Sequence, residues 1–519
     1  MPLSLIWPAD ASAAVTSGDA SATKRQFAVR QFGARGDGRT KDTRSIQSAI
    51  DAAGVSGGTV FLSGGTYLSG TLRLRSRVTL HLDGGATLTA SADKDDFDPC
   101  EKLNYQSYSD EETTDFHYVL LRGQDVEHVS ILGSGVIDGN RAKRGGPKPI
   151  AFKNCRHVAV RNITIKNSPN YNVSLLGCDY VNIDGVTILN GHCDGIDPDC
   201  CRHVRIANCF IESWDDAIAL KSSFALGRRR ATENVTVTNC VLTTACNALK
   251  LGTESSGNFK NVAFRNCAVF SRPELWKRHP ISGVSIESVD GGDMDRVTVS
   301  NIAMTDVRTP VFIRLGGRGR GQKTPAPGRL QNVSLADIVA TGAALASSIT
   351  GIPGHPARRV TLKNVRITAL GGGGADLARR DIPERESRYP EADMFGELPA
   401  SGLFCRHVEG LTLDGLSLDL EEPDGRPGLV VDEASDLDLR SLRVAPAAGG
   451  EPALWLRDVR GCFLHDLRAQ EGTKIFARLS GGRTEKIRAK SNDFSEAQEA
   501  FRLGEEVRKE ALRQEGNLR

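Results

Sequence analysis

Residues 158–165 read VAVRNITI, residues 181–188 read VNIDGVTI, and residues 204–211 read VRIANCFI. Each phrase alternates apolar and polar residues, turns at a polar or glycine corner, and then alternates again, which is the pattern of two short β-strands. The phrases begin 23 residues apart. A strand-turn-strand unit of this length cannot bury its apolar side alone, but stacked copies can, so the repeat predicts a parallel β-solenoid.

Further copies of the phrase follow along the chain, and they begin at Val235, Val262, Val297, Val333, Val360, Leu411 and Leu437. The longer gaps between copies are expected to form loops, and these insertions comprise residues 224–232, 271–282, 316–331 and 371–402. Insertions in a solenoid usually project from one face, which is often the binding face.

The composition favours an all-β protein with many short strands and turns. The 519 residues include 54 glycines, and 39% of the residues are apolar but only 6% aromatic. Lys and Arg number 66 against 64 Asp and Glu, so the net charge of +2 gives no electrostatic reason to expect a nucleic acid or an anionic membrane as partner. No apolar run reaches the roughly 18 residues that are needed to span a bilayer.

The two ends of the chain lack the repeat, so the sequence is divided into three segments. Residues 1–26 contain a short apolar run and small residues that are typical of the end of a secretion signal, but no basic residue precedes the run. This segment is interpreted either as a leader to the periplasm or the exterior, or as a disordered start. Residues 27–490 are expected to form the solenoid. Residues 491–519 are expected to form a helical tail, because 495–514 are rich in Glu, Ala, Lys and Arg.

A capping helix is expected before the first strands of the repeat. In KDTRSIQSAIDAAG, Asp42 or Thr43 is the expected N-cap and Gly54 the expected stop, and one helical face consists of Ile46, Ala49, Ile50 and Ala53. An open solenoid end exposes apolar surface, so this helix is suited to cover it.

The cysteines follow the same register as the phrases. Two trios recur at fixed offsets from the phrase starts, and each should form a column along the stack: Cys155, Cys178 and Cys201, and Cys209, Cys240 and Cys267. We expect buried thiols that pack as small apolar residues, with disulfides as the alternative, and no CxxC pair indicates zinc.

Three aspartates stand out against the alternating pattern. Asp194, in HCDGIDPD, and the adjacent Asp215 and Asp216, in SWDDAIALK, lie at similar offsets from their phrase starts, so one coil should separate them. Coils are about 4.8 Å apart, and a lateral offset would bring the carboxylates toward the roughly 6.5–9.5 Å that holds a water in an inverting glycosidase. Crowding raises the pKa of one carboxyl, which can then act as general acid while an ionised neighbour activates water.

The acidic residues of this region also suit roles outside hydrolysis. Asp197 and Asp199 are equally typical of capped turns at a solenoid corner. Clustered carboxylates also bind Ca²⁺, which would suit a β-solenoid polysaccharide lyase.

Several motifs, taken together and in order, resemble the polygalacturonase-like glycoside hydrolases of family 28. They are FGARGDGRTKDTRSIQSAI at 32–50, GVIDG at 135–139, NSPNYNV at 167–173, CDGIDP at 193–198 and SWDDAIALKS at 213–222, and the resemblance covers about residues 30–339. It implies a right-handed single-stranded parallel β-helix. It also implies that Asp215 is the general acid and that Asp194 and Asp216 hold the attacking water.

Two motifs depart from the family's usual pattern. Cys246-Asn247-Ala248 stands in place of Gly-His-Gly, so a histidine that tunes the acid is missing. Ser285-Ile286-Glu287 stands in place of Arg-Ile-Lys, whose cations bind a uronate carboxylate, and a glutamate there would repel galacturonate. Polar groups near these motifs are expected to bind sugar hydroxyls instead, while arginines in FIRLGGRGRG can still supply a cation. The expected substrate-binding residues are His192, Asp197, Trp214, Lys221, Asn247, Lys250, Glu254, Glu287, Arg314 and Arg318.

Some of these residues have a structural alternative. Lys250 and Glu254 have the spacing of a surface ion pair. Trp214 suits either stacking on a sugar or filling a coil corner, and His192 suits a structural role or substrate orientation.

The sequence thus predicts a glycoside hydrolase that cleaves an α-linkage in a pectin-like or other polysaccharide or oligosaccharide by inversion. The cleaved site is expected to carry a neutral sugar, and neither a cofactor nor a metal is expected. The alternatives are a β-helix polysaccharide lyase and a non-catalytic carbohydrate-binding solenoid.

Overall fold

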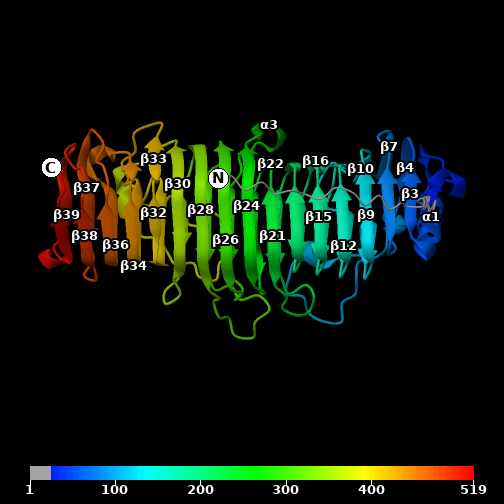
Figure 1. Cartoon of the computed structure of the whole chain (residues 1–519), viewed down its shortest axis with the longest axis horizontal. Helices are drawn as coiled ribbons and strands as arrows, with labels where there is room; N and C mark the ends of the chain where they lie inside the picture. Colours follow the sequence, from blue (N-terminus) through cyan, green and yellow to red (C-terminus); the bar gives the residue numbers. More distant parts are fainter. Residues whose placement is uncertain (1–24) are drawn as a thin grey trace, which may run out of the picture.

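Each coil of the chain contributes short parallel strands, and in the computed structural model, which describes residues 25–519, the coils stack along one long axis (Figure 1). The predicted register is confirmed, because Val158 pairs with Val181, Val181 with Val204, and Val204 with Val235. The expected parallel β-helix is therefore confirmed. The expected leader at 1–26 lies outside the described residues except for its last two.

Three ladders of parallel strands run the length of the solenoid, and the first of them carries the site described below. In the central coils its strands are buried on both sides, and every residue is buried in eight successive strands, from Lys148–Lys153 to Ser347–Thr350. The first sheet consists of β5 (Leu72–Arg73), β8 (Val119–Gln124), β11 (Lys148–Lys153), β14 (Val173–Leu176), β17 (Ile196–Asp199), β20 (Ile218–Ser222), β23 (Asn247–Ser255), β25 (Ser282–Ser288), β27 (Thr309–Leu315), β29 (Ser347–Thr350), β31 (Leu403–Glu409), β37 (Thr473–Ser480) and β39 (Ala497–Leu503).

The second sheet faces the viewer in Figure 1, and several of its longer strands continue into the third sheet. The second sheet contains β1 (Gln26–Ala28), β3 (Gly58–Leu62), β6 (Val78–Leu82), β9 (Glu127–Gly133), β12 (Arg156–Arg161), β15 (Asp179–Asp184), β18 (Arg202–Ala207), β21 (Thr232–Thr238), β32 (Thr412–Asp414), β38 (Glu485–Lys490) and β40 (Leu512–Glu515). The third contains β2 (Asp37–Lys41), β4 (Gly65–Ser69), β7 (Ala86–Ala90), β10 (Val136–Asp138), β13 (Thr164–Lys166), β16 (Thr187–Gly191), β19 (Phe210–Ser213), β22 (Val241–Thr244), β33 (Ser417–Leu420) and β35 (Arg443–Val444). Strands that take part in two sheets are β31 and also β24 (Phe259–Phe270), β26 (Met294–Thr305), β28 (Leu330–Ala343), β30 (Ala357–Ala369), β34 (Leu429–Arg440) and β36 (Pro452–His465).

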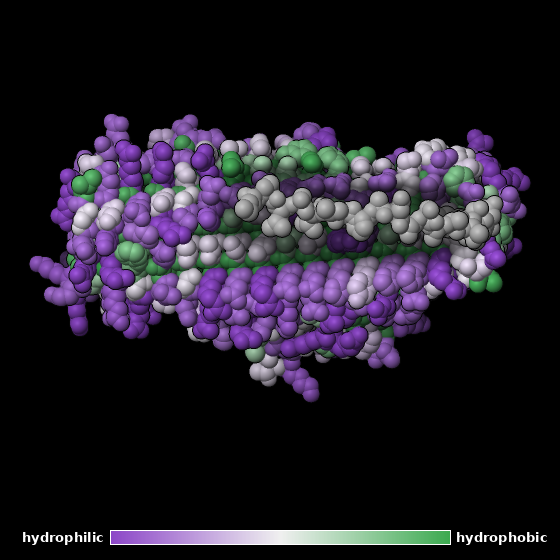
Figure 2. All heavy atoms as spheres, viewed as in Figure 1, coloured by the Kyte–Doolittle hydropathy of each residue, from purple (hydrophilic) through white to green (hydrophobic). Residues whose placement is uncertain are grey.

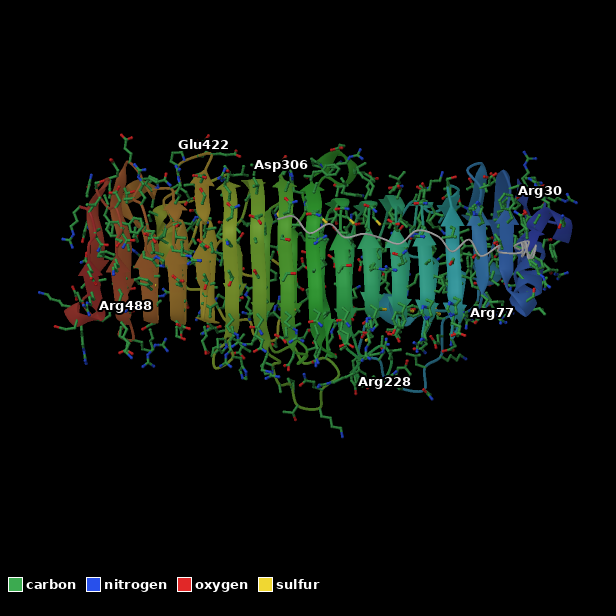
Figure 3. All side chains as sticks on the ribbon, viewed as in Figure 1. Arg30, Arg77, Arg228, Asp306, Glu422 and Arg488 are labelled. Carbon is green, nitrogen blue, oxygen red and sulfur yellow. The ribbon has the colours of Figure 1, made fainter. Side chains whose placement is uncertain are left out.

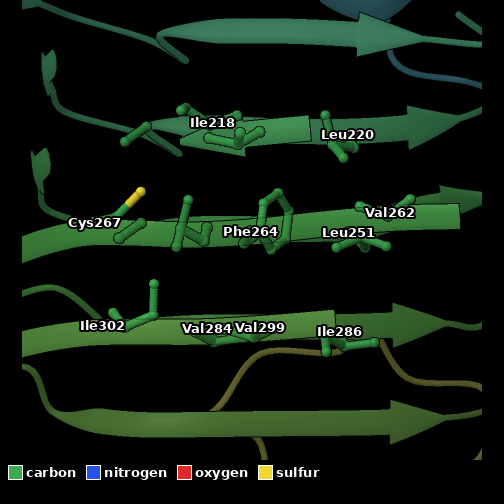
Figure 4. Packing of buried hydrophobic residues seen from close by; sticks show 14 of the residues in the cluster. Ile218, Leu220, Leu251, Val262, Phe264, Cys267, Val284, Ile286, Val299 and Ile302 are labelled. Carbon is green, nitrogen blue, oxygen red and sulfur yellow. The ribbon is translucent and has the colours of Figure 1, made fainter. Parts of the chain in front are cut away.

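The core is a continuous apolar column inside the coils, formed by the inward residues of the alternating strands. Figure 4 shows Leu251 and Phe264 of one coil, with Ile286 of the next coil stacked beside them. The two predicted cysteine trios contribute to it as buried residues. All twelve cysteines are free thiols, so the disulfide alternative is wrong.

The predicted capping helix is confirmed as α1 (Thr43–Ser56), which lies at one end of the solenoid (Figure 1). Its four predicted apolar residues are fully buried. Asp42 is the N-cap residue, as predicted, although its carboxylate accepts bonds from the backbone N–H groups of Arg35 and Gly36 and not from the helix. The predicted stop is wrong, because Gly54 lies inside the helix, which ends at Ser56 with Gly57 as its C-cap.

The predicted helical tail at 491–519 is wrong. Residues 495–514 form β39 and β40, joined through a short 3₁₀ turn at Lys509–Ala511, and both strands extend the parallel stack. The local preference for a helix is weak for an isolated segment, whereas the previous coil offers open backbone partners for a strand. The ring of Phe501 also packs edge-on against Phe494, at 5.3 Å between centroids.

The insertions leave from both edges of the first sheet rather than from one. Segments 224–232 and 316–331 follow strands of this sheet, whereas 271–282, which contains α3 (Pro273–Trp276), and 371–402 precede them. Figure 1 shows α3 on one side of the coils and loops on the other, and Arg228 lies among the latter in Figure 3. The outer face of the first sheet is thereby framed on both sides.

The opposite face, seen in Figure 2, is mostly hydrophilic, with apolar residues visible in a narrow band along the long axis. Within residues 25–519, no helix has the length and apolar character to cross a bilayer.

Candidate active site

The three aspartates lie where turns lead into the first sheet. Asp194 precedes β17, and Asp215 and Asp216 precede β20. The carbonyl of Asp194 accepts a bond from the backbone N–H of Asn172 at 2.9 Å, and that of Asp216 accepts one from Gly195 at 2.8 Å. Asp194 and Asp216 therefore occupy neighbouring coils, as the sequence predicts.

The carboxylates of the three aspartates lie close together. One oxygen of Asp194 lies within 4.8 Å of one oxygen of Asp215, and one oxygen of Asp215 lies within 4.8 Å of one of Asp216. These distances join the nearest oxygens and not the whole carboxyl groups, so the reaction's stereochemistry stays a prediction.

Asp194 and Asp197 share one buried cation, Lys221. Its ammonium lies 2.8 Å from a carboxylate oxygen of each aspartate and donates to the hydroxyl of Tyr171 at 2.9 Å. Burial, together with the charge of Asp197, raises the pKa of Asp194 well above its usual value. Asp194 therefore gains a proton more readily than an exposed aspartate does.

The turn-cap alternative fits Asp199 but not Asp197. Asp197 lies inside β17, whereas Asp199 is the last residue of that strand. Asp199 accepts a bond from the backbone N–H of Ser223 at 2.8 Å and holds the start of the 224–232 insertion. Asp197 instead points toward the cation of Lys221, beside Asp194.

Asp216 is held in its ionised form by a different cation. Its carboxylate lies 3.0 Å from the ammonium of Lys250 and accepts a bond from the side-chain amide of Asn247 at 2.8 Å. Burial alone would raise the pKa of Asp216, but Lys250 and then Lys221 outweigh it and lower the pKa below its usual value. Asp216 is therefore the carboxylate best prepared to accept a proton from water.

Asp215 is the most open of the three, with 22% of its side chain exposed, against 4% for Asp194 and 6% for Asp216. One of its oxygens accepts a bond from the backbone N–H of Asp216, and the other from the guanidinium of Arg144 at 2.7 Å. Arg144 also binds Glu112, in the short helix α2 (Glu111–Thr114). A substrate oxygen that receives a proton from Asp215 has to replace Arg144.

Lys250 lies at the centre of an acidic group on the next coils. Its ammonium is 3.6 Å from Glu391 and 4.0 Å from Glu287, besides its contact with Asp216. Burial raises the pKa of Glu287 to about 8 and that of Glu391 to about 7. The expected surface ion pair of Lys250 with Glu254 is wrong, because Lys250 is buried in β23 and binds other carboxylates.

Glu254 belongs to a separate buried network with two arginines. Arg320 contacts it at 3.2 Å, and Arg318 at 4.0 Å. The guanidinium of Arg318 is mainly occupied by Asp290, at 2.6 Å, and by the carbonyl of Thr253. Arg318 therefore lies beside the site but has its charge already paired.

Arg314 corrects a prediction, because it does not point at the aspartates. Its buried guanidinium donates to the carbonyls of Gly351 at 2.9 Å and Glu384 at 2.6 Å, and it lies 5.4 Å from the ring of Phe395. It fixes the 371–402 insertion and is not available for a substrate carboxylate.

Two predicted residues, Trp214 and His192, are only partly buried. Trp214 is 36% exposed, with the guanidinium of Arg278 5.9 Å from its ring, so it does not fill a closed corner. The ring of His192 is half-buried, and burial lowers its pKa, which favours the neutral imidazole.

The donor atoms near the aspartates fit Ca²⁺ poorly. The two groups with metal-ligand spacing each combine two carboxylates with a thiol, Cys193 in one and Cys246 in the other. Calcium prefers six to eight oxygen ligands, and the nearby ammonium groups already neutralise two of the carboxylates.

Three residues of the site could not be predicted from the repeat pattern. Arg144 lies in a loop, Glu391 in the 371–402 insertion, and Tyr171 in a turn. Only Tyr171 falls within a motif quoted above, NSPNYNV. The other two lie in segments whose sequence has no period, so spacing cannot place them.

Comparison with known proteins agrees with this arrangement. A family model described as glycosyl hydrolases family 28 matches residues 48–382. A probable polygalacturonase of Vitis vinifera is 26% identical over 365 residues, which cover 65% of this chain and 73% of the relative. An endo-polygalacturonase of Pectobacterium carotovorum subsp. carotovorum is 25% identical over 362 residues, covering 63% of this chain and 84% of the relative.

Solved structures support the fold. An exopolygalacturonase from Thermotoga maritima has a TM-score of 0.60 at 19% identity, covering 76% of this chain and 92% of that chain. The family model spans more than half of the sequence and includes all three aspartates. The chain therefore belongs to glycoside hydrolase family 28 and is a polygalacturonase-like glycoside hydrolase.

Proposed function

We propose that the protein hydrolyses an α-glycosidic bond in a pectin-like polysaccharide or its oligomers, with inversion, at a site occupied by a neutral sugar. The observation that carries the proposal is the charge around Lys250. This cation stands beside the aspartate cluster and is surrounded by Asp216, Glu287 and Glu391.

The proposed roles follow from exposure and protonation. Asp215 is the general acid, because its side chain is the most accessible of the three to a leaving oxygen. Asp216, whose pKa is lowered by Lys250 and Lys221, activates water, and Asp194 positions it. Trp214, which is exposed, offers its ring to a sugar face.

The preference for a neutral sugar rests on the pairing of the cations that lie beside the aspartates. Lys221 binds two aspartates, Arg318 binds Asp290, and Arg144 bridges Glu112 and Asp215. A uronate placed beside Glu287 would be buried without a free cation to pair with it, and an unpaired buried carboxylate costs several kcal/mol. Because the polymer substrate lies outside cells, we further propose that the protein is exported.

The test is a screen of the purified protein against polygalacturonate and against neutral α-linked polysaccharides and oligosaccharides, with reducing ends as the readout. Cleavage of a neutral substrate with little action on polygalacturonate is expected. Efficient cleavage of polygalacturonate would refute the neutral-sugar assignment. Unsaturated products that absorb in the ultraviolet, with loss of activity on chelation, would indicate the lyase alternative, and binding without turnover would indicate a non-catalytic solenoid.

A further inference from the structure

Two carboxyl groups around Lys250 each have an oxygen without a hydrogen-bond partner. In the described part of the chain, Oε2 of Glu287 and Oε2 of Glu391 are buried and accept no hydrogen bond. The Glu287 side chain is fully buried, and that of Glu391 is 20% exposed. Because buried polar atoms are nearly always paired, two such oxygens in one place indicate a partner from outside the protein.

Both groups lie beside the catalytic cluster. The ammonium of Lys250 joins them, since Asp216, Glu391 and Glu287 lie 3.0, 3.6 and 4.0 Å from it. The other oxygen of Glu391 lies 3.4 Å from the side-chain amide of Asn247, which also binds Asp216. A ligand that contacts these glutamates would therefore also lie beside Asp216.

The chain fixes Glu391 in place from outside the solenoid core. The 371–402 insertion packs in a second apolar cluster against the outer face of the first sheet, where Phe312, Phe404 and Trp455 contribute to the cluster. Ala392 and Met394, close to Glu391 in sequence, are among its buried members. Glu391 is therefore carried by an anchored segment, which is a requirement for a selective contact.

The raised pKa values of the two groups suit hydroxyl recognition. With a pKa of about 8 for Glu287 and about 7 for Glu391, a carboxyl here carries a proton near neutral pH for part of the time. A protonated carboxyl both donates and accepts hydrogen bonds, as a hydroxyl does.

We infer that Glu287 and Glu391 form a subsite that binds the hydroxyl groups of a neutral sugar and rejects a uronate, and that the 371–402 insertion supplies half of it. The inference deepens the proposed function and rests on it. It gives the insertion a specificity role that the repeat itself does not carry.

The experiment compares Glu391→Ala with Glu391→Gln on the best neutral substrate of the screen and on polygalacturonate. Loss of a substrate hydrogen bond lowers affinity about tenfold, so Glu391→Ala should lower kcat/KM on the neutral substrate by about that factor, mainly through KM. Glu391→Gln keeps a hydrogen-bond donor and an acceptor, so it should retain most of the wild-type kcat/KM. The matched control is Glu397→Ala, in the same insertion, whose carboxylate pairs with Arg426 at 3.0 Å and is half exposed.

The outcomes separate this inference from the proposed function. If the wild type cleaves a neutral substrate and both Glu391 variants keep its kcat/KM, the inference is wrong and the proposed function stands. If the wild type cleaves nothing in the screen, the proposed function is wrong. Calorimetric binding of the neutral oligosaccharide to Asp215→Asn, with and without Glu391→Ala, then decides the subsite: equal affinity overturns it, and a tenfold loss supports it.

Discussion

The buried carboxyl of Glu287 makes a prediction about stability that needs no substrate. Its side chain is completely buried, its Oε1 accepts a bond from the hydroxyl of Ser285, and its nearest cation, Lys250, is 4.0 Å away. The change Glu287→Gln replaces it with a neutral side chain of the same shape. We expect this variant to gain stability over the wild type as the pH rises.

The magnitude follows from the pKa of Glu287, which burial raises from 4.5 to about 8. Because the folded state holds the proton more tightly than the unfolded state, this group's contribution is complete below pH 4.5 and is lost as the pH rises through 8. The free energy of unfolding of the wild type is therefore lower by about 5 kcal/mol at pH 8.5, and by less than about 1 kcal/mol at pH 5, than it is with Glu287 fully protonated. The glutamine does not titrate and avoids this loss.

The assay is thermal unfolding of both proteins at pH 5 and at pH 8.5. A chain of this length has an unfolding entropy of about 1 kcal/mol per kelvin, so the Tm of Glu287→Gln should exceed that of the wild type by about 4 °C at pH 8.5 and by less than about 1 °C at pH 5. The control is Glu409→Gln, a half-exposed residue that pairs with Arg358 at 3.1 Å, where the Tm difference should be small at both pH values. An equal Tm difference for Glu287→Gln at the two pH values would refute the reasoning.

Three further predictions concern the catalytic cluster. Changing any of the three aspartates to Asn should lower kcat by about 10²–10⁴ while the protein stays folded, and an Asp215→Asn protein with near wild-type turnover would exclude Asp215 as the acid. Proton NMR of the first-formed product should show the inverted anomer, whereas a retained anomer would indicate a nucleophilic carboxylate. Lys250→Met should lower the free energy of unfolding by about 3–5 kcal/mol, because Asp216 loses its nearest cation. For the same reason the acidic limb of the pH–rate profile should shift to higher pH. The control is Lys153→Met, which removes the buried ion-pair partner of Glu101, 2.7 Å away. This variant should lower Tm without shifting the pH–rate profile.

The sequence predicted those parts of the molecule that repeat. Inward residues such as Val181 and Val204 recur at a fixed spacing because each coil must present the same apolar face to the next, and the aspartates inherit their positions from that register. The capping helix was predictable for the same reason, since its apolar stripe has a period of its own.

The rest depends on contacts between segments that no period relates. Glu391 reaches Asn247 across 144 residues of sequence, and Arg144 reaches Asp215 across 71. The tail at 491–519 was mispredicted because helix propensity is local, whereas the strand that forms there is determined by the preceding coil. Arg314 was misplaced because its loop motif says nothing of the insertion to which it binds.

The second apolar cluster has a consequence for how such proteins diversify. Because the 371–402 insertion is attached to the outer face of the first sheet through side chains such as Phe312 and Phe404, it shares none of its buried members with the column inside the coils. A lineage can therefore exchange this segment without repacking the interior of the scaffold. The same separation makes the segment a natural unit for grafting, in which one transplanted loop would change sugar preference while the coils and the aspartates stay as they are.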